Sequence, residues 1–248
     1  MKSLLIALSA CMLALPGHAD TVSVAVAANF TAPMQKITAA FQQETGHRVT
    51  LAFGSTGRFY AQIKNGAPFE VLLAADDETP AKLEQEGLSI KGSRFTYAVG
   101  QLVLWSPQAD MVDAQGQVLK TGRFNKIALA DPKLAPYGLA ALETMTRLGV
   151  LASLRPRWVL GENIAQTYQF VSTGNAQLGF VALSQVLTDG RIAQGSAWVI
   201  PEQLHTPIRQ DALLLLRQGQ AKPAALALLH YLQSEKARHI IRASGYKV

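Results

Sequence analysis

The chain has 248 residues, enough for one large domain or two of modest size. Apolar residues make up 49% of the sequence and charged residues 16%, so the composition allows a sizeable core and excludes a disordered chain. The formal net charge of +6 is spread out, without a block of Lys or Arg or a basic-aromatic stripe, and gives no support to nucleic-acid binding.

The first nineteen residues, MKSLLIALSACMLALPGHA, are a predicted secretory signal. Lys2 provides a positive start, an apolar stretch runs from Leu4 to Leu15, and small residues precede a predicted cleavage after Ala19. The apolar stretch is too short to span a bilayer permanently. A lipid anchor at Cys11 is not expected, because the LSAC sequence lies too early in the segment. We therefore expect a protein exported to the periplasm whose mature chain has no cysteine.

The next part of the chain alternates strand and helix patterns. The patterns predict a strand at 21–28, a helix at 31–45 capped by Thr31, a strand at 48–53, a helix that follows the 54–57 turn, a strand at 69–75 and a helix at 78–87. This βαβαβα order predicts an α/β fold with a parallel sheet.

The second half repeats this alternation with longer connections. The predicted elements are a strand-like stretch at 97–106, a strand at 127–131, a helix at 137–148, a strand at 157–161, a helix at 163–173, strands at 178–182, 198–200 and 209–217, and helices at 222–233 and 234–243. The last forty residues lack a sheet of their own, so we expect them to return to the first lobe. The predicted division is 20–100 plus 210–248 for lobe I and 101–209 for lobe II. Two crossings would join the lobes around a ligand cleft; periodicity alone leaves a single-lobe arrangement open.

Several catalytic and cofactor motifs are absent. The sequence has no G-x-x-x-x-G-K-[ST] loop, no G-x-G-x-x-G after a strand and no G-x-S-x-G elbow. The histidines beyond the leader are scattered without metal-ligand spacing. Asp76 and Asp77 could form a catalytic carboxylate pair, but we expect an Asp after a strand to cap the next helix.

Three joints, where a predicted strand gives way to a helix, are small and polar: AANF (27–30), GSTG (54–57) and APYG (135–138). In open α/β sheets, ligands gather at the carboxyl ends of strands, where helix N-termini offer free N–H groups. Asn29 supplies an amide NH₂, Ser55 and Thr56 supply hydroxyls, and Tyr137 supplies a backbone N–H. Each joint alone could be an ordinary turn. Together they predict a site for a small anion.

The predicted donors are neutral, and this affects selectivity. A tetrahedral dianion without protons needs only donors, whereas hydrogen phosphate brings a proton that needs an acceptor. An unpaired proton in a buried site costs on the order of 1–3 kcal/mol. The pattern therefore favours sulfate-like ions over phosphate, and the choice among sulfate, molybdate and tungstate depends on cavity size.

Longer motifs carry a family resemblance. VAVAANF, the GSTG joint with AQIKNGAPFEVLLAADD, PYGLAALETMTRLG and LGFVALSQ together resemble the periplasmic molybdate-binding proteins of ABC transporters. The resemblance extends from about Thr21 to Val248. It implies a type II periplasmic-binding-protein fold, in which two α/β lobes hold an oxyanion in the cleft between them.

The resemblance also implies a ligand set and a partner. The implied oxyanion ligands are the backbone N–H of Ala28, Asn29, Ser55, Thr56, and the backbone N–H groups of Tyr137 and Ile164. Molybdenum would enter only as the bound oxyanion, with no direct protein–metal ligand, no cofactor and no catalytic residue. The expected partner is an inner-membrane ABC permease, and the expected state is a monomer. The chain departs from the family pattern at Asn29 and Thr56, where many relatives have serine, and at Ala182, where some have a tyrosine. Arg58, just inside the helix after the GSTG joint, is an arginine beside a neutral site.

The leading hypothesis is a periplasmic binding protein for molybdate and also tungstate. One alternative is a binding protein for sulfate, thiosulfate or another small oxyanion. A remote alternative is a secreted hydrolase with Ser55 or Thr56 as nucleophile, although no motif indicates the base that it needs.

Overall fold

The structure is a computed structural model that describes residues 20–217 and 221–248. The predicted leader, with its cleavage position and Cys11, lies outside the described residues. Within those two ranges, no helix combines the length and apolar character needed to cross a membrane.

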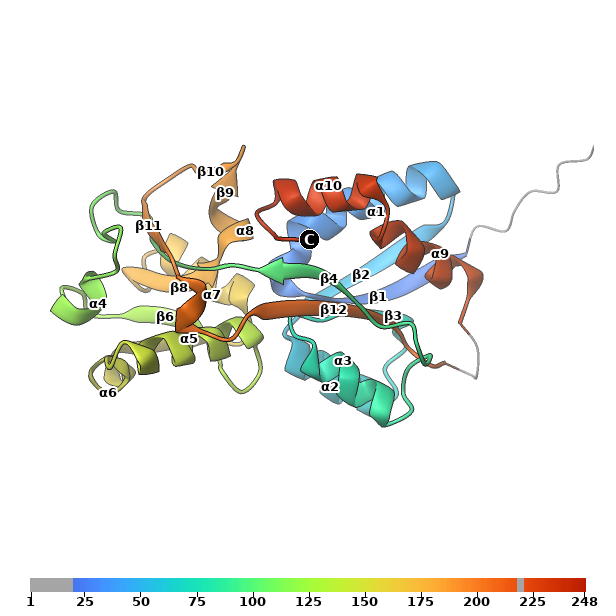
Figure 1. Ribbon diagram of the computed structural model, residues 1–248, viewed down its shortest axis with the longest axis horizontal. Coiled ribbons are helices and arrows are strands. Elements are labelled where there is room, and N and C mark those ends of the chain that lie inside the picture. The colour runs from blue at the N-terminus through green and yellow to red at the C-terminus, as the bar shows by residue number, and fades with distance from the viewer. Residues whose placement is uncertain (1–19, 218–220) are drawn as a thin grey trace, which may run out of the picture.

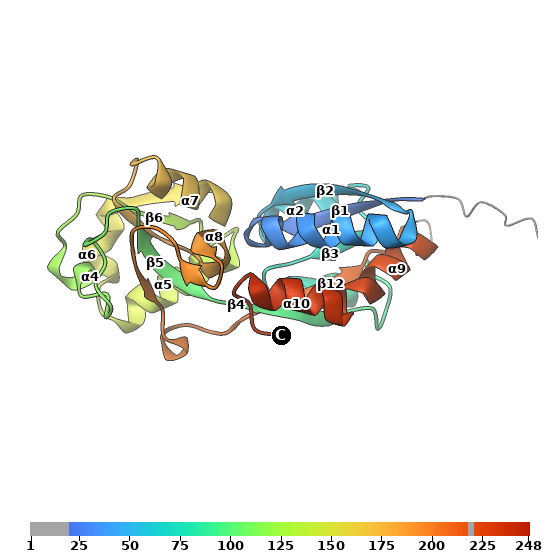
Figure 2. The same ribbon diagram turned by 90° about the horizontal axis from the view of Figure 1, so that it is seen from above.

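Two separate five-stranded sheets form the centres of two lobes (Figures 1 and 2). The first sheet has the order β2-β1-β3-β12-β4, with β1 parallel to β2 and β3 and with β12 antiparallel to β3 and β4. Its strands are β1 (Thr21–Ala27), β2 (Arg48–Gly54), β3 (Val71–Leu73), β4 (Phe95–Gly100) and β12 (Ile208–Leu214).

The second sheet has the order β11-β5-β8-β6-β7, with β6 parallel to β7 and β8 and with β5 antiparallel to β8 and β11. Its strands are β5 (Leu102–Ser106), β6 (Ile127–Ala130), β7 (Trp158–Gly161), β8 (Leu178–Ala182) and β11 (Ser196–Val199). The two-residue strands β9 (Leu187–Thr188) and β10 (Arg191–Ile192) pair separately.

Helices cover both sheets. The first sheet carries η1 (Ala28–Phe30), α1 (Thr31–Thr45), α2 (Thr56–Lys64), α3 (Glu78–Gln85), α9 (Pro223–Leu232) and α10 (Glu235–Ala243). The second lobe contains α4 (Val118–Thr121), α5 (Pro136–Arg147), α6 (Leu151–Leu154), η2 (Arg155–Arg157), α7 (Ile164–Ser172) and α8 (Leu183–Val186), and η3 (Glu202–Leu204) lies on the return to the first lobe.

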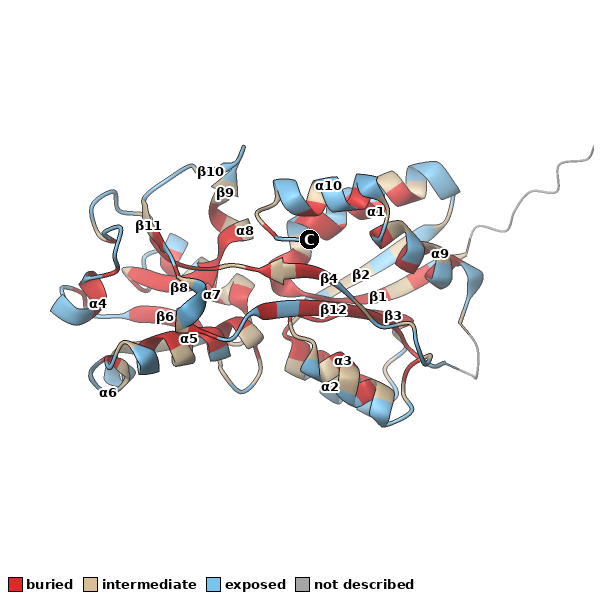
Figure 3. Ribbon diagram, viewed as in Figure 1, coloured by how far each residue is buried: buried red, intermediate tan, exposed pale blue. Residues whose placement is uncertain are grey.

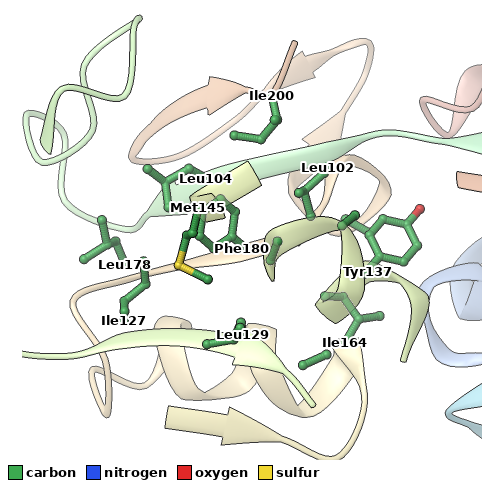
Figure 4. Packing of buried hydrophobic residues seen from close by; sticks show 14 of the residues in the cluster. Leu102, Leu104, Ile127, Leu129, Tyr137, Met145, Ile164, Leu178, Phe180 and Ile200 are labelled. Carbon is green, nitrogen blue, oxygen red and sulfur yellow. The ribbon is translucent and has the colours of Figure 1, made fainter. Parts of the chain in front are cut away.

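The cores follow from the apolar patterns of these elements. In α1, the buried residues Met34, Ile37 and Phe41 lie on one helical face and join the core that α9 and α10 also enter. The strands at the centre of both lobes are buried, while the outer helix faces are exposed (Figure 3). In the second lobe, Leu104, Met145 and Phe180 belong to the largest core (Figure 4).

The chain crosses between the lobes twice. The strand-like stretch predicted at 97–106 is divided at Gln101 into β4 and β5, one in each sheet. The second crossing leads through η3 into β12, which lies between β3 and β4 of the first sheet. The C-terminal segment returns with it, since α10 packs on α1 and Lys247 bridges to Val99.

The start of α1 differs from the prediction. Thr31 was expected to cap this helix, but the 3₁₀ turn η1 already begins at Ala28, and Thr31 is the first residue of α1. Its hydroxyl donates to the carbonyl of Ala28 at 2.9 Å. The turn therefore places the N–H groups of Ala28 and Asn29 directly beyond β1.

Candidate anion-binding site

A small cavity lies between the lobes, where the strand-to-helix joints of both sheets meet. The empty space there, including its opening to solvent, is about 210 Å³. All six residues of the predicted ligand set line it, together with residues of the same joints. The lining residues are Ala27, Ala28, Asn29, Gly54, Ser55, Thr56, Ala75, Ala135, Pro136, Tyr137, Asn163 and Ile164.

Four helix starts surround this cavity, two from each lobe. The turn η1 follows β1 and α2 follows β2, while α5 and α7 belong to the second lobe. The first N–H groups of a helix have no partner within the helix, and the helix dipole gives them partial positive charge. The convergence of these starts therefore makes the cavity suited to an anion.

Ser55 and Thr56 at the start of α2 have different hydrogen bonding. Ser55 is the N-cap residue of α2, yet its hydroxyl makes no cap hydrogen bond and is buried without a partner in the part of the chain that the structure describes. The hydroxyl of Thr56 accepts the backbone N–H of Ala75 at 2.9 Å and so joins α2 to the end of β3. Ser55 thus has its whole hydrogen-bonding capacity free in the cavity, whereas Thr56 has its own hydroxyl proton left to donate.

Gly57 brings the two lobes into backbone contact beside the cavity. Its N–H donates to the carbonyl of Leu134, in the loop before α5, at 3.0 Å. A Cβ at position 57 would lie 3.0 Å from that carbonyl oxygen. A glycine is therefore suited to this position because it allows the close approach.

Asn29 is oriented differently from the prediction. Its amide NH₂, expected to face the anion, donates to Gln210 Oε1 at 2.8 Å and to the hydroxyl of Tyr246 at 3.0 Å. Both partners lie behind the cavity wall. The N–H that Asn29 offers at the cavity is therefore the one on its backbone.

The backbone N–H of Tyr137 lies at the cavity, whereas its phenol hydroxyl is bonded in the protein interior. Pro136 is the first residue of α5 and has no N–H, so the first free N–H of this helix belongs to Tyr137. The phenol points out of the second-lobe core (Figure 4), and its oxygen accepts Gln210 Nε2 at 3.2 Å. Complete burial raises the pKa of Tyr137 well above its usual value, so the hydroxyl stays neutral.

The fourth helix start contains a residue that sequence reasoning missed. Asn163 lines the cavity, and its side-chain oxygen accepts the N–H groups of Ala165 and Gln166 at 3.0 Å each. This cap leaves the N–H of Ile164, the residue between them, without a side-chain partner. An Asn two residues after the strand RWVLG is the capping signal that could have indicated this joint.

No charged side chain lines the cavity, and no histidine does. A wider groove, with about 800 Å³ of empty space including open solvent, adjoins it and shares Ala75, Ala135 and Pro136 with it. That groove carries several carboxylates, including Asp76, whose pKa burial raises to about 6. Asp76 accepts the backbone N–H of Thr79, in the first turn of α3, at 2.8 Å, while the N-cap residue Asp77 makes no side-chain cap hydrogen bond. Lys133 and Arg209 also line the groove, but the carboxylates outnumber them, which makes the groove a poor second site for a dianion.

Arg58 and Ala182 lie outside the cavity lining, whereas Asn29 and Thr56 belong to it. Arg58 forms an ion pair with Glu162 of the second lobe, and the two side chains remain 54% and 42% exposed. Ala182 is fully buried in β8 and does not line the cavity. Within residues 20–217 and 221–248, no group of three or more His, Cys, Asp or Glu side chains is arranged to hold a metal ion.

Comparisons with known proteins agree with this architecture. The model of the "Bacterial extracellular solute-binding protein" family matches residues 22–247. The chain is 54% identical to the molybdate-binding protein ModA of Azotobacter vinelandii, over 99% of this chain and 97% of that protein. It is 53% identical to the Rhodobacter capsulatus protein of the same name, over 94% and 91% of the two chains.

Solved structures show the same fold. The periplasmic molybdate-binding protein of Azotobacter vinelandii superposes with a TM-score of 0.87 at 39% identity, over 92% of this chain and 99% of that one. The sulfate-binding protein SubI of Mycobacterium tuberculosis reaches a TM-score of 0.75 at 10% identity, over 92% and 86%, which shows a shared fold alone. The chain therefore belongs to the bacterial extracellular solute-binding protein family, and within it to the ModA family.

Proposed function

We propose that this protein captures molybdate, and also tungstate, in the periplasm and delivers it to an ABC permease of the inner membrane. The observation that carries the proposal is the neutral cavity between the lobes, in which the hydroxyl of Ser55 is buried without a partner. A buried hydroxyl without a partner is destabilising unless a ligand satisfies it. The molybdate-binding relatives at 54% and 53% identity support the choice of anion.

The proposed ligands are the six residues predicted from the sequence. The backbone N–H groups of Ala28, Asn29, Tyr137 and Ile164 would donate to the oxyanion, as would the hydroxyls of Ser55 and Thr56. Molybdate would be held through its oxygens alone, so the protein needs no direct ligand to molybdenum. The first-lobe and second-lobe donors would reach the same ion only when the lobes are together, which couples capture to closure.

The chemistry of the lining supports selectivity against phosphate. Molybdate has no proton at neutral pH that needs an acceptor, whereas hydrogen phosphate has one. None of the lining residues has a carboxylate to accept such a proton. The proton of hydrogen phosphate would then be buried unpaired, at roughly 1–3 kcal/mol or about 5- to 150-fold in affinity.

The proposal also covers the processing of the leader, the oligomeric state and the folding units of the protein. The leader would be removed after Ala19 without lipidation at Cys11, and the mature protein would act as a monomer without a cofactor and without catalysing a reaction. Its folding units would be residues 20–100 with 210–248, and 101–209. Mass spectrometry of the exported protein tests cleavage after Ala19 without lipidation, and light scattering tests the monomeric state.

Thermal unfolding with a series of oxyanions tests the function. Molybdate at about a thousand times its Kd should stabilise the protein by about 4 kcal/mol. Tungstate should act similarly, and phosphate should have little effect at the same concentration. Calorimetry should give one molybdate per chain. An equal or larger shift with sulfate or thiosulfate would instead identify one of those ions as the ligand.

A further inference from the structure

Gln210 lies behind the proposed molybdate site and is fully buried. It belongs to β12, the strand that returns from the second lobe to the first, and pairs with Ala98 of β4 next to a register shift. Both strands are continuous with the crossings between the lobes. The side chain is therefore located where a change in lobe orientation would be transmitted.

The amide of Gln210 contacts a cavity-lining residue from each lobe. Its oxygen accepts Asn29 Nδ2 at 2.8 Å and the hydroxyl of Tyr97 at 3.0 Å, while its nitrogen donates to the hydroxyl of Tyr137 at 3.2 Å. Asn29 lies at the start of η1 in the first lobe, and Tyr137 lies at the start of α5 in the second. One side chain thus connects two of the helix starts that present N–H groups to the cavity.

A second set of contacts supports the orientation of Asn29. The hydroxyl of Tyr246 donates to the backbone carbonyl of Asn29 at 2.7 Å, and Ser184 of α8 donates to the same carbonyl at 3.0 Å. Asn29 and the three tyrosine side chains of this network, Tyr97, Tyr137 and Tyr246, are all buried. Burial raises the pKa of each tyrosine, so all three hydroxyls are neutral hydrogen-bonding groups at neutral pH.

The fold leaves space for this arrangement at Gly100, the last residue of β4. A Cβ at this position would clash with the hydroxyl of Tyr137 and would lie 2.5 Å from Gln210 Nε2. The glycine has no positive φ, so backbone conformation does not require it. The space for the Gln210–Tyr137 hydrogen bond is what requires a residue without a side chain.

We propose that Gln210 is a positioning residue that couples anion binding to lobe closure. By holding Asn29 and Tyr137 together, it aligns the N–H donors of both lobes on one ion. This inference rests on the proposed function. It assigns Gln210 no contact with the anion, so its loss should weaken binding through the closed state rather than by removing a ligand.

The test compares Gln210→Met with wild type and with Gln101→Met. Methionine has a similar length but cannot form the hydrogen bonds. Gln101 lies in the crossing segment next to Gly100, and its side chain donates to the carbonyl of Gly245, not to a cavity-lining residue. The Kd for molybdate is measured by calorimetry, the dissociation rate by stopped-flow fluorescence, closure by small-angle scattering, and unfolding of the ligand-free proteins in urea.

We expect Gln210→Met to weaken molybdate binding by roughly 10- to 100-fold, with most of the change in the dissociation rate. The compaction on adding saturating molybdate should also become smaller. Gln101→Met should bind within twofold of wild type. If Gln210→Met is folded and binds like wild type, the positioning role is wrong. If its only change is lower stability of the ligand-free protein, the role is structural and the proposal is also overturned.

Two further variants keep the test decisive if Gln210→Met does not fold. Tyr137→Phe removes the hydroxyl that accepts from Gln210 but keeps the backbone N–H, and Gly100→Ala fills the space between them. Both should accelerate molybdate release, and wild-type rates in both would contradict the proposal. Wild-type protein measured in parallel separates the two hypotheses: failure of the wild type to bind molybdate overturns the proposed function itself.

Discussion

Ser55 and Thr56 are neighbouring hydroxyl residues whose substitutions should separate ligand binding from folding. The hydroxyl of Ser55 has no partner among the described residues, so Ser55→Ala should leave the ligand-free protein as stable or slightly more stable. Molybdate affinity should fall by about tenfold, the equivalent of one hydrogen bond of about 1.4 kcal/mol. Calorimetry and urea unfolding measure the two effects.

Thr56→Val is the matched comparison for this prediction. It removes the oxygen that accepts the N–H of Ala75, so it should lower stability by about 1–3 kcal/mol as well as affinity. A Ser55→Ala variant that loses stability but keeps its affinity would show that the hydroxyl has a role in folding and not in binding.

Asp76 should make stability depend on pH. Burial raises its pKa in the folded protein to about 6, against 3.8 for the ordinary carboxyl. The folded state therefore holds the proton more tightly than the unfolded chain does. The resulting stabilisation is fully present below about pH 4 and is lost as the pH rises through 6, by up to roughly 3 kcal/mol.

The Asp76→Asn variant tests this pH dependence. The asparagine oxygen can still accept the N–H of Thr79, so this hydrogen bond in the first turn of α3 is kept. Relative to wild type, the variant should gain stability in urea unfolding as the pH rises from 4 to 7. Asp77→Asn controls for the loss of one negative charge. A stability difference that does not change with pH would contradict the shifted titration.

The orientation of Asn29 shows what could not be predicted at the scale of one residue. The type and position of Asn29 indicated a donor at the cavity, and the residue does line it. The direction of its amide depends on Gln210 and Tyr246, which are 181 and 217 positions away in the sequence. No local pattern contains that information. Ile164 is a similar case, because its apolar side chain gives no sign of the free N–H.

At the scale of elements, the helix starts could be predicted because each has a local cause. An apolar strand ends at small residues, and a capping or glycine residue begins the next helix. The four-residue helices α4, α6 and α8 were not predicted. Helices of this length gain little from propensity and depend on tertiary packing. The same reasoning explains why the break between β4 and β5 was missed, since 97–106 has one continuous strand-like pattern.

Asn163 provides the prediction for an element, because it caps α7 and also lines the cavity. Asn163→Ala should lower the free energy of unfolding by about 1 kcal/mol, since the N–H groups of Ala165 and Gln166 lose their partner. Asn163→Asp should keep the cap and the stability, because a carboxylate suits a helix start.

The Asn163→Asp substitution would also place a negative charge beside the bound dianion. At an effective dielectric constant of about 20 the repulsion exceeds roughly 3 kcal/mol, so molybdate affinity should fall by more than about 100-fold. Urea unfolding and calorimetry on both variants test this separation. Equal molybdate binding by wild type and Asn163→Asp would place the anion away from the start of α7.

At the scale of the whole molecule, two lobes could be predicted because each half of the chain carries its own strand–helix alternation. The way in which the lobes meet could not be predicted, because it depends on single contacts between residues that are far apart in the sequence. The N–H of Gly57 reaches the carbonyl of Leu134, and Ser184 of the second lobe reaches Asn29 of the first. The absence of a side chain at Gly57 allows this close approach of the two lobes.

Arg58 and Glu162 make the one ion pair among the described residues that joins the start of α2 to the start of α7. Because both side chains are about half exposed, the pair should contribute less than about 1 kcal/mol. Arg58→Ala should therefore change the molybdate Kd by less than about fivefold.

Arg58→Glu should have a larger effect, because two carboxylates would then face each other across the cleft and oppose closure. Adding Glu162→Arg to that variant should restore binding, and salt should reduce every difference in the series. Calorimetry on the three variants at low and high ionic strength tests this, and loss of binding in the charge-reversed double variant would show that Arg58 acts on the anion itself.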